Sequence, residues 1–325
     1  MKWVLHLTYA FHCILALYPG PLPWPLDQLK SAVLQMLSAV ACVLFCSTVA
    51  SARNSINGDA AANLLPALLG GSEADFLKLL DEAATIDDVF AGRVSGTAAL
   101  LDFRTSFAAR LHSRHPRALE VLRVTADAGA QRVAVEQVLP LDAGSAWDVC
   151  TSTGRANSST EVLFTTVAEL SPTGTLAAVR LYYPSYPITG QGIMRRPILA
   201  HNANATTSGE VAKYQEALGA GDADGVAAAF ERDGYFREPS GEYHSGATAG
   251  VLANFRSFFS LGHGGGIKLE HCRVTTDGVA FVLEYNCVGW GGVTLKPTAG
   301  VATYELGRTG RIMGGRVNDN VQPPS

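Results

Sequence analysis

The sequence predicts an α+β protein in which two copies of one small domain follow each other along the chain. Four observations lead to this prediction. Short motifs recur in the same order about 150 residues apart. Each half reads as helices followed by strands, and the apolar first fifty residues differ in composition from the rest. The length of 325 residues suits two domains behind a leader.

The repeat consists of three pairs of matching motifs. In the first pair, the segments Ser95–Ala99 and Phe103–Phe107 match Ser245–Ala249 and Phe255–Phe259. In the second pair, Arg123–Asp127 matches Arg273–Asp277. In the third pair, Thr173–Leu176 with Arg180 matches Thr309–Ile312 with Arg316. Three ordered matches over so long a unit indicate duplication of a whole domain, because solenoid repeats are far shorter.

The second copy is predicted to begin with two helices, Gly209–Leu218 and Gly225–Glu231. A short extended piece, Tyr235–Glu238, then leads through the turn Pro239–Gly241 into a third helix with Phe255 on its apolar face. Four strands follow: Lys268–Thr275, Val279–Gly289, Leu295–Leu306 and Arg311–Asn318. Asp277-Gly278 and Thr309-Gly310 are typical hairpin turns. Three helices on an antiparallel sheet form one domain.

The first copy follows the same plan with a long polar insertion, Asp142–Ser159. Its helices are expected at Ser72–Ala83 and Gly96–Leu111, and its strands near Leu119–Ala126, Arg132–Leu139, Thr160–Leu170 and Leu176–Tyr183. We therefore divide the chain into a leader over 1–52, a first domain over 53–184, a linker over 185–207 and a second domain over 208–321.

The sequence of the leader, residues 1–52, indicates that the protein is exported. Leu37–Val49 has the length of a signal-peptide apolar region, and Ala50-Ser51-Ala52 has the form of a cleavage site. The mature chain would then start near Arg53 and keep no stable membrane span. The alternative is an uncleaved anchor, because Val33–Ala50 is about the minimum length for crossing a bilayer. The glycosylation sequons at Asn157 and Asn204 agree with an export route.

Composition excludes several functions. A net charge of −4 with thinly spread Lys and Arg gives no basic face for nucleic acid. The three cysteines outside the leader, Cys150, Cys272 and Cys287, have no metal-ligand spacing. We expect buried thiols at Cys272 and Cys287. The sequence contains no nucleotide or flavin motif, so we expect neither a cofactor nor a metal.

The second copy contains a set of diagnostic residues: Tyr214, Gly221-Asp222, Phe230, Glu238–Gly241, Gly246 and the Thr309–Ile312 hairpin. Through these residues it resembles the SnoaL-like and ketosteroid isomerase branch of the nuclear transport factor 2-like fold. It covers about Gly209–Asn320 and extends more faintly to the first copy, Ala60–Pro184. The resemblance implies cone-shaped domains with a curved sheet. It implies no particular activity, because the superfamily includes enzymes and binding modules.

The isomerase branch moves a proton with a carboxylate while a phenol and a second acid stabilise the enolate oxygen. The resemblance places Tyr214 on the phenol position and Glu238 on the proton-transfer position, whereas the second-acid position falls near Ala302. In the first copy, Asp88 matches Glu238, but Leu64 and Thr166 stand at the other two positions. The first copy therefore looks degenerate.

Two functions remain open. The first is an isomerase, polyketide cyclase or lyase that acts on a small hydrophobic molecule through Glu238 and Tyr214, with His244, Phe230 and Phe255 as ligand-binding candidates. The second is a non-catalytic module that binds an apolar ligand or a protein. The two sheets are also candidates to pack on each other as an intramolecular pseudo-dimer, or to form a homo-oligomer.

Overall fold

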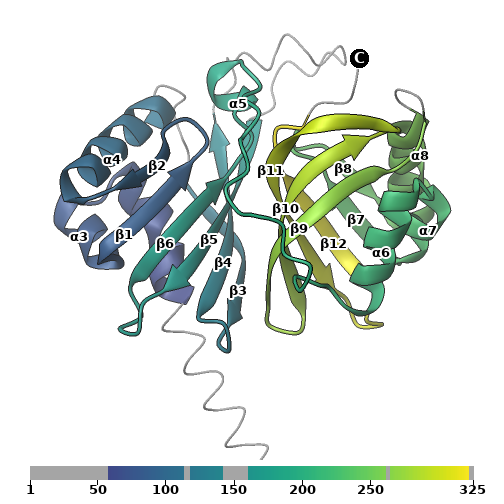
Figure 1. Ribbon diagram of the computed structural model, residues 1–325, viewed down its shortest axis with the longest axis horizontal. Coiled ribbons are helices and arrows are strands. Elements are labelled where there is room, and N and C mark those ends of the chain that lie inside the picture. The colour runs from purple at the N-terminus through teal and green to yellow at the C-terminus, as the bar shows by residue number, and fades with distance from the viewer. Residues whose placement is uncertain (1–57, 113–117, 142–159, 261–263, 322–325) are drawn as a thin grey trace, which may run out of the picture. The chain divides into compact units, whose positions relative to one another are not determined.

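The computed structural model describes residues 58–112, 118–141, 160–260 and 264–321, all of which belong to one compact unit, Arg53–Ser325. The tandem α+β prediction is confirmed. Two six-stranded sheets have the strand orders β2-β1-β6-β5-β4-β3 and β8-β7-β12-β11-β10-β9, which are the same topology twice. Helices cover one face of each sheet (Figure 1). The leader, Cys150 and Asn157 lie outside the described residues.

The first domain starts with a helix over residues 58–69. It continues with α3 (Glu73–Leu79), β1 (Leu80–Asp88), β2 (Gly92–Ser95), α4 (Thr97–His112), β3 (Glu120–Asp127), β4 (Arg132–Leu141), β5 (Thr160–Leu170) and β6 (Leu176–Tyr182). A short helix, α5 (Tyr186–Thr189), opens the linker.

The second domain repeats this order. It contains α6 (Gly209–Ala220), α7 (Ala223–Ala228), β7 (Phe230–Arg237), β8 (Tyr243–Ser245), the π-helix η2 (Gly246–Val251), α8 (Leu252–Ser260), β9 (Ile267–Thr276), β10 (Ala280–Trp290), β11 (Val293–Leu306) and β12 (Ile312–Asn318). Asp222 caps α7 by accepting the Gly225 N–H at 2.9 Å. Gly278 and Gly310 have positive φ at the two predicted hairpin turns.

Two predicted helices are too long, because each runs into a strand. The helix expected over Ser72–Ala83 ends at Leu79, where β1 begins, and the helix expected over Gly225–Glu231 ends at Ala228, just before β7. β1 pairs in parallel with β6, and β7 pairs in parallel with β12, so each sheet is mixed. Pairing with a strand that follows about 80 to 95 residues later overrides the local helix preference of these segments.

Each domain has its own apolar core between its helices and its sheet. Cys272 and Cys287 are free and buried, as expected. Within the described part of the chain, no helix combines the length and the apolar character needed to cross a bilayer.

The faces of the two sheets that carry no helices contact each other. A cluster of Ala134, Val167, Tyr182, Val282 and Val301 joins β4, β5 and β6 to β10 and β11. Two buried ion pairs flank this cluster and cross between the domains: Arg180 Nε lies 2.5 Å from Glu284 Oε1, and Arg316 Nη2 lies 2.7 Å from Glu136 Oε2.

The two ion pairs are equivalent under the repeat, because Arg180 corresponds to Arg316 and Glu136 to Glu284. Glu284 binds Arg180 and also accepts the Tyr182 hydroxyl hydrogen at 2.8 Å. The same surface on each domain is therefore used for the contact, as in an isologous dimer.

Candidate functional site

The second domain encloses an apolar cavity of about 340 Å³ between its helices and the inner face of its sheet. This volume falls at the lower end of the range found for small-molecule pockets. Most of the wall is aromatic or aliphatic, and two carboxyl groups interrupt it. The lining residues are Tyr214, Leu218, Phe236, Glu238, Pro239, Ser240, Phe255, Phe258, Ile267, Leu269, Tyr285, Cys287, Trp290, Ala302, Tyr304, Val317, Asp319 and Val321.

Tyr214 lines this cavity from α6 and is almost fully buried. Its ring packs against Tyr304, with the two ring centroids 5.0 Å apart, and the Tyr304 hydroxyl accepts a hydrogen bond from Gln215 Nε2 at 2.7 Å. Burial and the neighbouring Tyr304 hydroxyl raise the pKa of Tyr214 well above its usual value. The phenol therefore keeps its proton at neutral pH and remains a hydrogen-bond donor.

Glu238 lies at the end of β7 and lines the cavity from the turn that leads to β8. The Gly241 N–H donates to the Glu238 carbonyl at 2.9 Å, which closes the turn. One carboxylate oxygen of Glu238 lies 2.7 Å from His244 Nε2, and the other accepts a hydrogen bond from Ser240 Oγ at 3.3 Å. His244 therefore orients the carboxylate and, when protonated, pairs with its charge.

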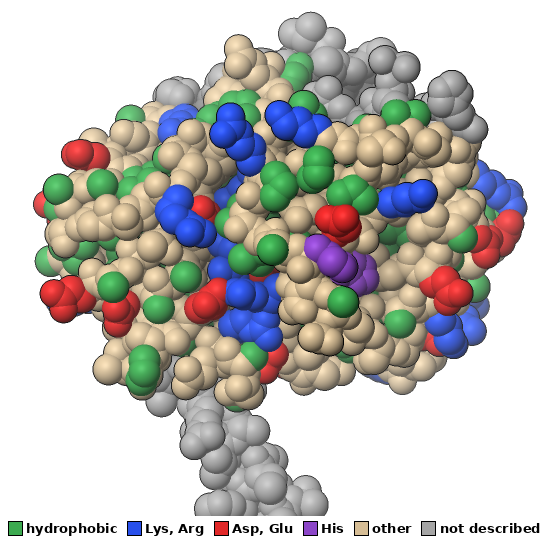
Figure 2. Space-filling model, in the orientation of Figure 1, with side chains coloured by type: hydrophobic (Ala, Val, Ile, Leu, Met, Phe, Trp, Pro, Cys, Tyr) green, Lys and Arg blue, Asp and Glu red, His purple; other side chains and the backbone are tan. Residues whose placement is uncertain are grey.

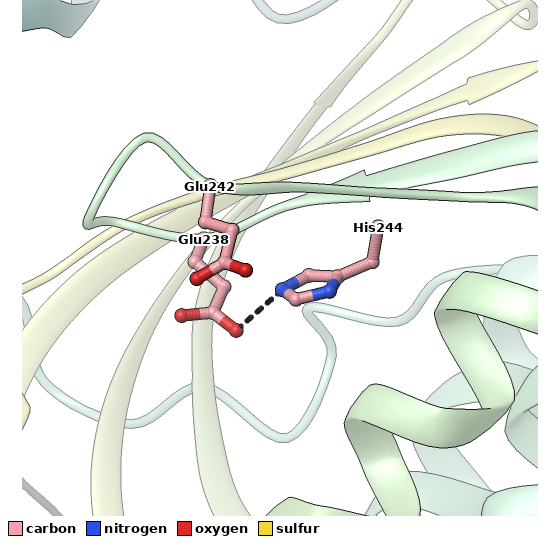
Figure 3. A group of neighbouring side chains, drawn as sticks. All are labelled: Glu238, Glu242 and His244. Atoms are coloured by element: carbon pink, nitrogen blue, oxygen red, sulfur yellow. Dashed lines mark hydrogen bonds and ion pairs between the residues drawn. The ribbon is translucent and has the colours of Figure 1, made fainter. Parts of the chain in front are cut away.

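Glu238, Glu242 and His244 come together around this turn and point toward one another (Figure 3). Their possible ligand atoms lie within 4.8 Å of one another. Among the described residues this is the group able to hold a metal ion, whereas the sequence motifs predicted no metal ligands. Carboxylate and imidazole ligands of this kind suit zinc and similar divalent ions. The pattern Glu-x₃-Glu-x-His around a Pro-Ser-Gly turn was the available signal.

Asp319 is a cavity-lining carboxyl that the sequence motifs did not point to. It follows β12, whose parallel register with β7 places Arg316 beside Arg237. The ends of two adjacent parallel strands thus bring Asp319 and Glu238 to the same edge of the sheet, and both carboxyls line the cavity. Asp319 Oδ2 accepts the Tyr285 hydroxyl hydrogen at 2.6 Å, and Oδ1 accepts the Val321 N–H at 3.2 Å.

The environment of Asp319 favours its protonated form. Asp319 retains some solvent-accessible surface, but protein atoms surround its carboxyl group, and burial raises its pKa to about 6 although Tyr285 and Val321 oppose the shift. Burial, and then the Asp319 carboxylate, raise the pKa of Tyr285. The cavity wall therefore contains a carboxyl whose pKa is raised to about 6, Asp319, and a second carboxyl, Glu238. Two carboxyl groups in one apolar cavity suit the transfer of a proton.

The remaining candidates of the second domain lie around the same cavity. Phe255 lines it, as does Ala302 at the position of the missing second acid. Phe230 is buried behind Tyr214, with ring centroids 5.8 Å apart, and is not among the lining residues. His244 contacts the lining residue Glu238 rather than the cavity itself.

Asp88 of the first domain has a different environment. Its Oδ1 accepts the N–H groups of Phe90 and Ala91 at 3.0 and 2.9 Å, and its Oδ2 accepts the Tyr183 hydroxyl hydrogen. Leu64 and Thr166, which replace the phenol and the second acid, are both fully buried. The first domain therefore uses its matching carboxyl to hold a turn and a buried tyrosine.

Residues 211–314 match the family model of the SnoaL-like domain. No match was found among curated proteins.

Solved structures of low sequence identity resemble the chain. One is a candidate SnoaL-like polyketide cyclase from Jannaschia sp. CCS1, with 14% identity, coverage of 42% of this chain and 94% of that chain, and a TM-score of 0.32. Another is a candidate ketosteroid isomerase from Kribbella flavida DSM 17836, with 19% identity, coverage of 40% and 79%, and a TM-score of 0.29. A third is a nuclear transport factor 2-like protein of unknown function from Cytophaga hutchinsonii ATCC 33406, with 17% identity, coverage of 36% and 93%, and a TM-score of 0.28.

Identities and TM-scores of this size carry no inference about activity. The family match lies wholly within the second copy of the repeat and includes Tyr214 and Glu238. The second domain of this chain is therefore a SnoaL-like domain.

Proposed function

We propose that the second domain binds a small hydrophobic molecule in its apolar cavity and transfers a proton within it, in a reaction of the isomerase or cyclase type. The observation that carries this proposal is the pair of carboxyls, Glu238 and Asp319, on the wall of one apolar cavity. Apolar walls favour an uncharged ligand, and a few polar groups orient it.

The roles follow from the contacts of each group. Glu238, oriented by His244, is the proton acceptor. Tyr214 keeps its proton and donates a hydrogen bond to an oxygen of the ligand. Asp319, with its raised pKa, supplies or receives the second proton. A ketone with an acidic C–H next to its carbonyl meets these requirements.

The test uses 2-tetralone, an enolisable two-ring ketone, and 2-naphthol, which is a planar phenol. Trp290 lines the cavity, so its fluorescence reports binding of either compound. Exchange of the tetralone α-protons in deuterated buffer, followed by NMR against a protein-free blank, reports proton transfer. Glu238→Gln should keep binding and lower the exchange rate about 100-fold, the lower end for loss of a general base.

The matched control is Glu242→Gln, because Glu242 lies in the same turn but does not line the cavity. The control should exchange protons at the wild-type rate. Exchange that survives in Glu238→Gln but not in Asp319→Asn would move the role of proton acceptor to Asp319. Binding without exchange in the wild type would favour the non-catalytic binding module, and no binding would overturn the pocket.

We also propose that the protein enters an export route and loses its leader near Ala52. The apolar run Leu37–Val49 and the Ala50-Ser51-Ala52 sequence support this proposal, as does the exposed position of Asn204 in its sequon. N-terminal sequencing of the protein from the medium of expressing cells should give a start near Arg53. A chain that starts at Met1 and stays with the membrane fraction would instead favour the anchor.

A further inference from the structure

A second cavity lies in the first domain, between its β1–β2 turn and the linker. It has a volume of about 620 Å³ and is lined by Asp87–Arg93 and Ile193–Ile198. None of these residues belongs to the cavity of the second domain. The wall carries three arginines, Arg93, Arg195 and Arg196, and two aspartates, Asp87 and Asp88.

Both aspartates are already neutralised. Asp87 is held by Arg93, whose Nη2 lies 3.0 Å from Asp87 Oδ2. Asp88 accepts two backbone N–H groups and the Tyr183 hydroxyl hydrogen, and Arg110 Nη1 lies 3.8 Å from its Oδ1. Two cations of the wall, Arg195 and Arg196, are left without a carboxylate partner among the described residues.

Arg195 is a buried cation with only 6% of its surface exposed. It donates to two backbone carbonyls, those of Leu181 and Asp87, and its guanidinium lies 4.5 Å from the centre of the Tyr182 ring. Carbonyl dipoles and a ring face compensate a buried charge only in part, so an anion placed in the cavity gains energy from Arg195. Arg196 is exposed next to it and adds a second positive charge.

The rest of the wall is apolar. Val89, Phe90, Ile193, Met194, Pro197 and Ile198 line the cavity beside the arginines. On the face shown in Figure 2, Lys and Arg side chains lie near the middle of the view and at its right edge, with Asp and Glu side chains among them. A site of this composition fits a ligand with an oxyanion at one end and a small apolar body at the other.

We propose that this cleft binds a small amphipathic oxyanion, with Arg195 and Arg196 on the oxyanion and Ile193 and Met194 on the apolar body. Carboxylates and phosphates share the recognised chemistry, because both offer oxygens to the planar guanidinium. The site is separate from the cavity of the second domain, whose two carboxyls disfavour an anion.

The experiment measures binding of phenyl phosphate and of benzoate to the whole protein by calorimetry at low salt. Arg196→Glu is the test variant, because Arg196 is exposed and its replacement leaves the core intact. Arg308→Glu, an exposed arginine on the β11–β12 turn, makes the same change in net charge away from the cleft. The dissociation constant should rise at least about tenfold in Arg196→Glu and stay within about twofold in Arg308→Glu.

Binding of phenyl phosphate alone would identify a phosphate site, and binding of benzoate alone would identify a carboxylate site. Binding of both probes would identify an oxyanion site that does not select between them. Each of these results supports the proposal if Arg196→Glu weakens the binding and Arg308→Glu does not. Equal weakening in both variants would show an unspecific charge effect and overturn the proposal. Absence of binding heat with both probes would overturn it as well. Unchanged 2-naphthol binding by Arg196→Glu confirms that the second domain of the variant is folded.

Discussion

The two domains share one topology but differ in what fills the cone between helices and sheet. In the first domain, Gln137 on β4 pairs with Phe164 on β5, and the Phe164 ring lies 4.8 Å from the Tyr183 ring. In the second, the equivalent pair on β10 and β11 is Tyr285 with Gly300. Asp319 stands where the first domain has Tyr183, because both come three residues after the equivalent arginines Arg316 and Arg180.

A small set of residue differences thus distinguishes the first domain, whose cone is filled by aromatic rings, from the second domain, whose cone contains the apolar cavity. Phe164 and Tyr183 contribute two rings to the first core, where Phe107 also packs against both of them. Gly300 contributes no side chain, and a Cβ added to it would lie 2.6 Å from the Tyr285 ring. The fold of the backbone forms the space between the helices and the sheet. The side chains at two or three positions then determine whether that space contains a cavity large enough for a ligand.

The largest effect is expected from emptying the filled cone. Phe164→Ala removes a fully buried ring and should lower the free energy of unfolding by about 3–5 kcal/mol. Chemical denaturation followed by circular dichroism measures this loss. A loss below about 1 kcal/mol would show that the first core is already loosely packed, and the contrast between the domains would disappear.

The next effect concerns the carboxyl that replaces Tyr183. The pKa of Asp319 is raised from 3.8 in the unfolded chain to about 6 in the fold, so the folded state binds more protons between these values. The contribution of Asp319 to the free energy of unfolding should therefore be fully present below about pH 4 and fall by up to about 3 kcal/mol as the pH rises through 6.

Asp319→Asn keeps an acceptor for the Tyr285 hydroxyl and cannot ionise. The difference in unfolding free energy between the wild type and Asp319→Asn, measured from pH 4 to pH 7.5, isolates the contribution of this group. A difference that stays constant with pH would mean that the Asp319 carboxyl is solvated like an ordinary surface group.

A smaller effect is expected from filling the hollow cone at its narrowest point. Gly300→Ala places a methyl group against Tyr285 and should cost about 1–3 kcal/mol of stability. It should also weaken binding of 2-naphthol, because the Tyr285 ring has to move into the cavity. Gly219→Ala on α6 is the control, since nothing lies within 4 Å of its added Cβ. Equal behaviour of the two variants would contradict the role assigned to Gly300.

The smallest effect is expected at the β-hairpins beside the two cones. Register places Asp87 opposite Arg93 in the first domain and Arg237 opposite Tyr243 in the second. Arg93 is largely exposed, so its ion pair with Asp87 contributes little. Arg93→Ala should lower the free energy of unfolding, measured by chemical denaturation, by less than about 1 kcal/mol. A larger loss would show that this hairpin supports the first core.

The sequence predicts the repeat, the order of the elements and the cavity-lining residues Tyr214, Glu238 and Phe255, because these depend on local pattern and on the resemblance of the second copy. It does not predict β1 and β7 as full strands, because their pairing partners, β6 and β12, come much later in the chain. Asp319 was missed for the same reason: only the parallel register of β7 and β12 brings it beside Glu238.

The crossed ion pairs between the sheets have a consequence for how such a chain evolves. Each of the two ion pairs, Arg180–Glu284 and Arg316–Glu136, joins a residue of the first domain to a residue of the second. A contact of the kind found in dimers is therefore present within one polypeptide. Covalent linkage keeps the two halves at a high effective concentration, and their association no longer depends on how much protein the cell makes. In a homodimer a mutation alters both subunits at once. In this chain each half changes alone, which allows the first half to pack aromatic rings in its core while the second half keeps an apolar cavity.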